Sequence, residues 1–208
     1  MAELTHVYLI RHSEQLKIMN KIVKNEESQI SNEKIILSVE GEKKAQEISE
    51  LEELDKIDTL WSSNYVRAIA TAKYIVKQNN IEINIDKALM KESYGDLEQL
   101  NELGKHKQNS FTIEQMLDEH LKNVGGESRK EVTDRMEKAF NRILSENSGR
   151  NIAIVSHGAS IKFLLMKWCS LNKDNQLEFK KKEIKLNSPG VLKLVFDDEN
   201  LVELAQIV

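Results

Sequence analysis

Arginine and histidine residues stand directly after three separate apolar runs, in "LIRHSE", "SSNYVRAIATA" and "IVSHGAS". These residues are Arg11, His12, Arg67 and His157. A guanidinium group matches phosphate oxygens with two parallel hydrogen bonds, and an imidazole nitrogen can attack phosphorus. If the three segments meet in space, the four side chains form an anion site that fits phosphate best.

The chemistry that this site favours is phosphoryl transfer through a histidine. The sequence lacks both glycine-rich phosphate loops, GxxxxGK[ST] and GxGxxG, and it has no HExxH zinc motif. One imidazole would become phosphorylated, and the arginines would neutralise the phosphoryl oxygens in the transition state. A general acid would then protonate the leaving oxygen. We therefore expect neither a metal nor an organic cofactor.

The apolar runs that precede these residues are predicted strands. Continuous runs at His6–Ile10, Asp58–Ser63 and Asn151–His157 are typical of strands buried on both faces, and "IEINID" alternates like a half-exposed strand. The runs "VLKLVF" and "LVELAQIV" flank the polar "DDEN", which predicts a C-terminal β-hairpin. In open α/β sheets the ligand lies beyond the carboxyl ends of the strands, where the arginines and histidines stand.

Helical patterns separate the predicted strands. Apolar residues recur three and four positions apart in "SRKEVTDRMEKAFNRIL" and in "HGASIKFLLMKWC". Further helices are expected after Gly41 and after Asn64, and a weaker one through "SFTIEQMLDEHLKNV" would carry His120 on its apolar side. This alternation predicts an α/β fold with helices on both faces of a mostly parallel sheet. With no obvious linker, residues 1–208 are expected to form a single domain.

Two helix starts carry capping signals. Ser128 and Glu131 have the spacing of a capping box. Ser63 or Asn64 could cap the helix that follows, which would place Arg67 in its first turn beside free N–H groups. A cation is locally unfavourable at that end of a helix, so a bound anion is expected between them.

Composition narrows the class of protein. The chain has 208 residues, of which 40% are hydrophobic and 31% charged, with a net charge of -4. Nothing in this balance favours nucleic acid as a partner, and no apolar stretch has the length of a membrane span. The start of the chain lacks the features of a signal peptide, and the lone Cys169 is expected in the core. We expect a cytoplasmic protein whose partner is a small phosphorylated substrate; the sequence leaves its oligomeric state open.

The order of the motifs carries a family resemblance. "LIRHSE", "SSNYVRAIATA", "GGES" and "VSHGASIK" resemble the histidine phosphatase superfamily, in the branch that contains the cofactor-dependent phosphoglycerate mutases, from about residue 5 to about residue 170. The resemblance implies a three-layer α/β/α sandwich with a mostly parallel central sheet. It also implies that His12 is the phosphorylated nucleophile, that Arg11 and Arg67 clamp the phosphoryl group, and that His157 donates to it.

The resemblance also implies a general acid after the second motif. The pattern L-x-E-x-x-x-G-x-x-E-G is matched best by "LMKESYGDLEQ", which places the acid at Glu92, with Asp96 and Glu98 as alternatives. Departures from the family pattern include Ser13, where glycine is usual, and Gln15 and Ile18 further along the first loop. They concern substrate recognition and leave the phosphate-binding residues intact.

These observations predict a metal-independent phosphomonoester phosphatase that acts through a phosphohistidine intermediate. One alternative is phosphoglycerate mutase-type phosphoryl transfer, although such mutases usually have longer insertions and a C-terminal tail over the site. A second alternative is a non-catalytic protein that binds a phosphorylated ligand. The sequence does not identify the physiological substrate.

Overall fold

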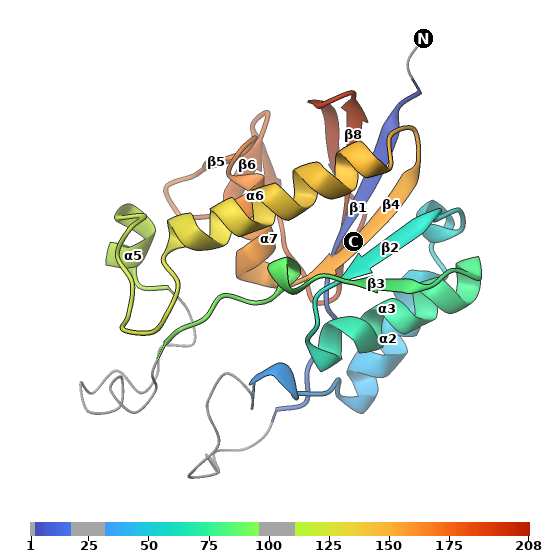
Figure 1. Cartoon of the computed structure of the whole chain (residues 1–208), viewed down its shortest axis with the longest axis horizontal. Coiled ribbons are helices and arrows are strands. Elements are labelled where there is room, and N and C mark those ends of the chain that lie inside the picture. Colours follow the sequence, from blue (N-terminus) through green and yellow to red (C-terminus); the bar gives the residue numbers. More distant parts are fainter. Residues whose placement is uncertain (1–2, 18–31, 96–110) are drawn as a thin grey trace.

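A six-stranded sheet forms the centre of the protein. The structure, a computed structural model, describes residues 3–17, 32–95 and 111–208 (Figure 1). The strands lie in the order β3-β2-β4-β1-β8-β9. Their bounds are β1 Thr5–Arg11, β2 Thr59–Ser62, β3 Ile83–Ile85, β4 Asn151–Ser156, β8 Gly190–Asp197 and β9 Asn200–Gln206.

The sheet is parallel except at one edge. β3, β2, β4 and β1 run parallel to one another, whereas β8 lies antiparallel to β1 and to β9. The predicted mostly parallel sheet and C-terminal hairpin are therefore confirmed. Because β2, β4 and β1 are neighbours, the carboxyl ends of the three strands that precede the arginines and histidines lie side by side.

Helices cover both faces of the sheet and complete the three predicted layers. One face carries α2 (Val39–Ser49) and α3 (Val66–Asn79), and the other carries α6 (Arg129–Glu146) and α7 (Gly158–Leu165) (Figure 1). The buried side chains of β1 divide between the faces in strict alternation. Val7 and Leu9 join the core under α6 and α7, whereas Tyr8 and Ile10 join the core under α2 and α3.

The helix α6 begins as its sequence predicts. Ser128 accepts a hydrogen bond from the Glu131 N–H, and the Glu131 carboxylate accepts one from the Ser128 N–H, so the capping box is complete. The apolar stripe that faces the sheet is fully in place, with Met136 and Phe140 at its centre. Cys169 lies in the same core, where burial raises the pKa of its thiol to about 11.

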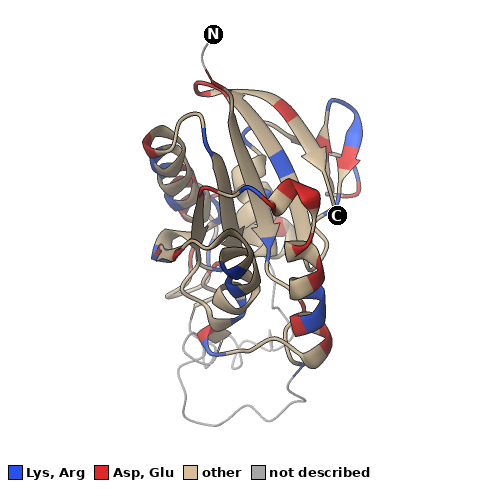
Figure 2. Cartoon of the chain, turned by 90° about the vertical axis from the view of Figure 1, so that its right-hand side faces the viewer, with Lys and Arg blue, Asp and Glu red and all other residues tan. Residues whose placement is uncertain are grey.

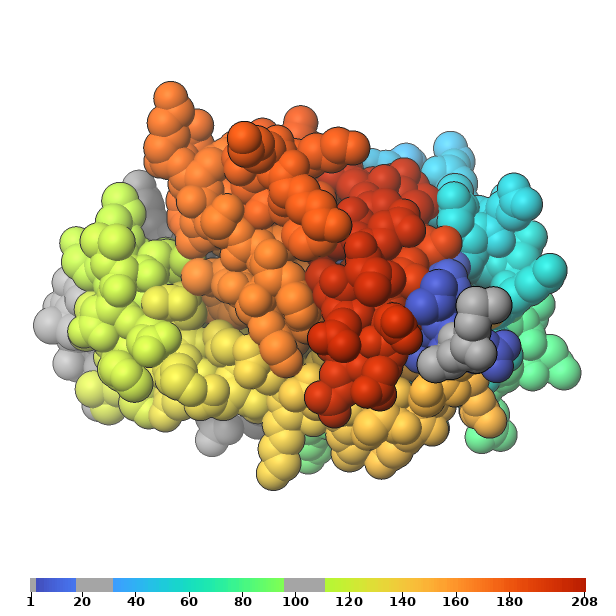
Figure 3. Space-filling view, turned by 90° about the horizontal axis from the view of Figure 1, so that it is seen from above, coloured from blue at the N-terminus to red at the C-terminus, as the bar shows by residue number. Residues whose placement is uncertain are grey.

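A small antiparallel sheet was not predicted from the sequence. Its strands are β5 (Ser170–Leu171), β6 (Leu177–Phe179) and β7 (Lys182–Ile184), in the order β5-β6-β7. This unit lies beside the β8–β9 hairpin in Figure 3, where it is orange and the hairpin red. Its strands are too short to show alternation, so the "FKKKEIK" segment reads from sequence only as a charged connection.

The prediction of a helix through His120 was wrong, because the observed helix is shorter. The helix α5 covers only Ile113–Leu117, and His120 lies beyond it with an exposed side chain. The Asp118 side chain accepts the His120 N–H, a local bond that competes with continuation of the helix. Short 3₁₀ turns at Glu52–Leu54 (η1) and Lys87–Leu89 (η2) complete the described elements.

The surface carries charges of both signs. In the view of Figure 2, positions of lysine or arginine and positions of aspartate or glutamate both occur along the helices. Among the described residues, no helix combines the length and apolarity needed to cross a membrane.

Phe140 offers a test of this packing. Its ring contacts Trp168 and Phe196 with ring centroids 5.6 Å apart in both pairs, and thus joins α6 to the sheet. We expect Phe140→Ala to lower the free energy of unfolding by about 3–5 kcal/mol in urea titrations, because it removes buried area and leaves a cavity. Lys138→Ala, at an exposed position of α6, should change it by less than about 0.5 kcal/mol. Equal stabilities of the two variants would contradict this packing.

Candidate active site

The ends of β1 and β4 bring the two histidines of the motifs together. The His12 N–H donates to the Ser156 carbonyl over 3.0 Å, which continues the pairing of β1 with β4 by one residue. His157 follows Ser156 directly. The two imidazole rings consequently lie with centroids 5.0 Å apart, and both are buried.

Arg67 lies between these rings. Its Nε is 3.1 Å from His12 Nε2, and its Nη2 is 3.3 Å from His157 Nδ1. The residue lies in the first turn of α3, as predicted, and it is fully buried. The N-cap residue is not Ser63 or Asn64, as predicted, but Tyr65, whose side chain makes no capping hydrogen bond. Ser63 Oγ instead accepts a hydrogen bond from the Tyr65 N–H.

The hydrogen bonds of His12 fix its tautomer. Its Nδ1 is 2.7 Å from the Ser13 carbonyl oxygen, which can only accept, so Nδ1 carries the proton. The Nε2 lone pair then accepts from the Arg67 guanidinium. Burial, and then the positive charge of Arg67, lower the pKa of His12 to about 3. The ring is therefore neutral near pH 7, with its unprotonated nitrogen toward Arg67.

His157 has the complementary arrangement. Because the Arg67 guanidinium only donates, His157 Nδ1 accepts, and the neutral ring carries its proton on Nε2. Nε2 lies 2.8 Å from Ser63 Oγ and donates to it. Burial lowers the pKa of His157 well below its ordinary value, and the nearby charges act in the same direction. Ser63 is thus a residue of this site that sequence analysis considered only as a helix cap.

Arg11 reaches the site from the end of β1. Its Nη1 donates to the Leu186 carbonyl over 2.5 Å, while its Nε is buried and has no hydrogen-bond partner among the residues that the structure describes. Gly158 makes room for it, since a Cβ at that position would lie 3.1 Å from Arg11 Nε. Burial lowers the pKa of Arg11, and the carboxylate of Glu92 opposes this fall.

Glu92 is buried at the same site, with 2% of its surface exposed. Its Oε1 accepts from Lys91 Nζ at 3.0 Å and from the Tyr94 hydroxyl at 2.5 Å. Its Oε2 is buried and has no partner in the described structure. The carboxylate is close enough to raise the pKa of both Arg11 and Arg67. The alternative acids, Asp96 and Glu98, lie outside the described residues.

Lys91 also belongs to this site, although it was not among the site residues predicted from the sequence. Its side chain is largely buried, and its charge contributes to the lowered pKa of His12 and His157. The signal was present: counted from Leu89 and from Gly95, the glutamate of the family pattern falls on Lys91, one residue before Glu92. The position of this glutamate in the family pattern therefore indicates both Lys91 and its neighbour Glu92.

Ser13, which replaces the usual glycine, makes its own bonds to the helices. Its Oγ donates to the Gly41 carbonyl over 2.7 Å, and its N–H donates to Thr71 Oγ1 over 2.9 Å. Both bonds join the loop after β1 to α2 and α3. Ile18 lies outside the described residues, and Gln15 forms an isolated bridge with Leu37.

The site has an excess of positive charge. Arg11 and Arg67 bond only carbonyl oxygens and imidazole nitrogens within residues 3–17, 32–95 and 111–208. With Lys91, three cationic side chains surround the Glu92 carboxylate and two neutral imidazoles, an excess that a phosphate dianion would balance. The described residues contain no group of three or more His, Cys, Asp or Glu side chains suited to a metal ion.

Solved structures with the same fold come from phosphatases and a mutase. A mycobacterial glucosyl-3-phosphoglycerate phosphatase has a TM-score of 0.68 and 17% identity, covering 99% of this chain and 98% of that chain. Phosphoserine phosphatase from Entamoeba histolytica has a TM-score of 0.65 and 20% identity over 96% of each chain. Phosphoglycerate mutase from Bacillus anthracis has a TM-score of 0.67 and 18% identity, covering 99% of this chain and 93% of that chain.

The sequence comparisons identify the family of the chain. "Phosphoglycerate mutase-like protein 4" of Arabidopsis thaliana is 31% identical over 130 residues, which are 60% of this chain and only 56% of that protein. The family description "Histidine phosphatase superfamily (branch 1)" matches residues 7–201, which include all the residues of the site described above. On this match, the chain belongs to the histidine phosphatase superfamily, a family of phosphoryl-transfer enzymes.

Proposed function

We propose that the protein is a phosphomonoester phosphatase that acts on a small phosphorylated metabolite through a phosphohistidine at His12. One observation carries this proposal: the buried guanidinium of Arg67 bonds the lone pair of a neutral imidazole and has no carboxylate partner among the described residues. A phosphoryl group that entered here would meet a nucleophile and its charge-neutralising groups together.

In the first step His12 Nε2 attacks the phosphorus atom. The Nδ1–H bond to the Ser13 carbonyl keeps the ring oriented and stabilises the positive charge that develops on it. Arg67 transfers its hydrogen bonds from the imidazoles to the phosphoryl oxygens, and Arg11 offers its unpartnered Nε–H. The bond from phosphorus to the ester oxygen breaks, and Glu92, in its protonated form, gives the proton on Oε2 to that oxygen.

In the second step water attacks the phosphohistidine. Glu92, now ionised, accepts a proton from the water as the P–N bond breaks, and phosphate leaves with the ring neutral again. His157 stabilises the phosphoryl charge in both steps. The dianion offsets the positive charges that depress the pKa of His157, so that ring becomes easier to protonate when phosphate is bound.

The comparisons support a small phosphorylated substrate. Two of the structures with this fold are phosphatases whose names include glucosyl-3-phosphoglycerate and phosphoserine, and the latter was solved with 3-phosphoglyceric acid. Because a phosphoglycerate mutase has the same fold, phosphoglycerate mutase activity is the second candidate function. Phosphate release from a panel of phosphorylated metabolites, compared with conversion of 3- to 2-phosphoglycerate, separates the two activities.

His12→Ala tests the nucleophile. We expect kcat/KM for phosphate release to fall by at least about 10³-fold, because the variant lacks the Nε2 lone pair that attacks phosphorus in the proposed mechanism. An acid-labile phosphoprotein should be trapped by rapid quenching of the wild type and be absent from the variant. His120→Ala, which removes an exposed imidazole, is the matched control and should retain activity. Undiminished turnover by His12→Ala, or loss of wild-type activity in a chelator, would refute the mechanism.

The protonation state of His12 can be measured directly. A lowered pKa of about 3 means that protonation is lost above that value, so the free enzyme should keep a neutral ring from pH 8 down to pH 5. The ¹⁵N shifts of the ring, assigned by comparison with His12→Ala, should show a protonated Nδ1 and an unprotonated Nε2 across this range. A titration midpoint near 6.5 in the free enzyme is the result that would contradict the arrangement.

Glu92→Gln tests the general acid. We expect kcat/KM for an alkyl phosphate to fall about 10²–10⁴-fold, the usual contribution of acid catalysis. For 2,4-dinitrophenyl phosphate, whose leaving group needs no proton, the loss should stay below about threefold. Because kcat/KM includes only steps up to alcohol release, this ratio isolates the first step. Equal losses with both esters would exclude Glu92 as the acid.

A further inference from the structure

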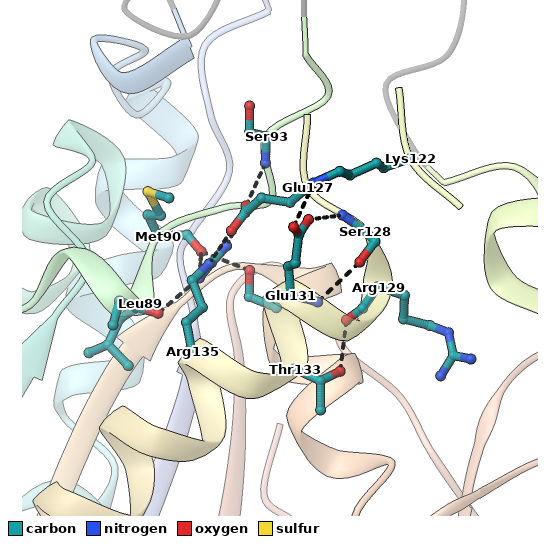
Figure 4. Close-up of polar contacts among 12 residues, drawn as sticks. Leu89, Met90, Ser93, Lys122, Glu127, Ser128, Arg129, Glu131, Thr133 and Arg135 are labelled. Atoms are coloured by element: carbon teal, nitrogen blue, oxygen red, sulfur yellow. Dashed lines mark hydrogen bonds and ion pairs between the residues drawn. The ribbon is translucent and has the colours of Figure 1, made fainter. Parts of the chain in front are cut away.

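The chain segment that carries Glu92 is held by Arg135, in the second turn of α6, and by Glu127, just before this helix. Arg135 Nη1 donates to the carbonyls of Ala88 and Met90, over 2.8 and 3.0 Å (Figure 4). Glu127 Oε2 accepts the Ser93 N–H over 2.9 Å, and the Glu127 N–H donates to the Ser93 carbonyl over 2.9 Å. These hydrogen bonds therefore hold the backbone on both sides of Glu92.

Arg135 and Glu127 also bind each other. The guanidinium and the carboxylate form a two-point ion pair, with Nε–Oε1 at 2.6 Å and Nη2–Oε2 at 2.9 Å. Their side chains are only 16% and 18% exposed, so neither is a free surface charge. Paired planar groups of this kind have little rotational freedom. The pair thus forms a rigid bracket that joins α6 to residues 88–93.

The same segment is joined to the element that carries His157. Ser156 Oγ donates to the Leu89 carbonyl over 2.7 Å, and Ser160 Oγ donates to the Met90 carbonyl over 2.8 Å. The Met90 carbonyl therefore accepts from α7 and from Arg135 at once. Since residues 90–95 form neither a helix nor a strand, these side-chain bonds replace the backbone ladder that would otherwise fix the position of Glu92.

We propose that Arg135 and Glu127 are positioning residues for Glu92, and that they set the direction in which its free carboxylate oxygen meets the leaving group. The inference rests on the proposed function, in which Glu92 is the general acid. Neither residue is needed to begin α6, which has its own capping box at Ser128 and Glu131. Their bonds instead go to the backbone around Glu92, whose placement decides how well a proton is delivered.

Arg135→Lys separates position from charge. Lysine keeps the positive charge that acts on the site, but it cannot pair with Glu127 at two points and bond two carbonyls at once. We expect kcat/KM for an alkyl phosphate to fall about 10–100-fold, and kcat/KM for 2,4-dinitrophenyl phosphate to change by less than about threefold. Glu127→Gln, which removes the charge of the partner while it keeps its shape, should shift the ratio in the same direction.

Arg142→Lys is the matched control. Arg142 also lies on α6 and pairs with Asp86 at 2.7 Å, just before η2, but its hydrogen bonds reach no carbonyl of residues 88–93. Both substrates should be turned over within about twofold of wild type. Full activity of Arg135→Lys toward the activated ester shows that the variant is folded and still phosphorylates His12.

The outcomes separate the two levels of the proposal. If Glu92→Gln discriminates between the esters and Arg135→Lys does not, the positioning role is overturned while the proposed function stands. If Glu92→Gln does not discriminate, the acid assignment fails and the positioning role fails with it. If Arg135→Lys loses activity equally toward both esters, the residue supports the site as a whole and the specific inference is wrong.

Discussion

The burial of the Arg67 guanidinium is the constraint on which the rest of the site depends. A fully buried cation is costly unless its charge is compensated, and its hydrogen-bond partners among the described residues are two imidazoles and a carbonyl. Burial accordingly lowers the pKa of Arg67 to about 10. Burial, with a further contribution from this cation, lowers the pKa of both histidines, which are therefore neutral. The site is therefore held ready for an anion, which would relieve the uncompensated charge and receive its hydrogen bonds.

Sheet order makes this arrangement possible. β4 lies between β1 and β2, so the residues that follow these strands meet at one edge although they are far apart in the chain. The loop after β2 leads directly into α3, which brings Arg67 up to the histidine rings. Glycine at position 158 lets the Arg11 side chain pack against the start of α7. Strand pairing thus sets the positions of the imidazoles, and helix starts set those of the cations.

The part of the site around Glu92 is built differently. Glu92 lies on an irregular connection, and its position depends on side chains from α6, α7 and β4 instead of on backbone pairing. Its neighbours Lys91 and Tyr94 hydrogen-bond one carboxylate oxygen, and the other is buried without a partner in the described part of the chain. The groups proposed to bind phosphate and the proposed acid are therefore held by separate sets of contacts, which can be altered independently in experiments.

The sequence by itself determined the layered fold and the four residues that we propose bind phosphate. Continuous apolar runs and helical spacing are local properties, and they predicted the strands and helices with small errors at their ends. The motif residues Arg11, His12, Arg67 and His157 could be named because each follows a strong strand signal. The short β5–β7 unit and the early end of α5 could not be predicted, because two- and three-residue strands and an Asp118 side-chain bond leave little periodic pattern.

Only the tertiary structure decided how these residues act on one another. The tautomers of both histidines, the role of Ser63 as a partner of His157, and the place of Lys91 beside Glu92 all follow from contacts between segments distant in the chain or irregular in backbone. Glu127 lies in the "GGES" motif, but its contacts with Arg135 and with the backbone around Glu92 could not be predicted, since the bonds to that backbone span more than thirty residues of sequence. Burial and directed hydrogen bonds arise when the layers pack, and a one-dimensional pattern contains neither.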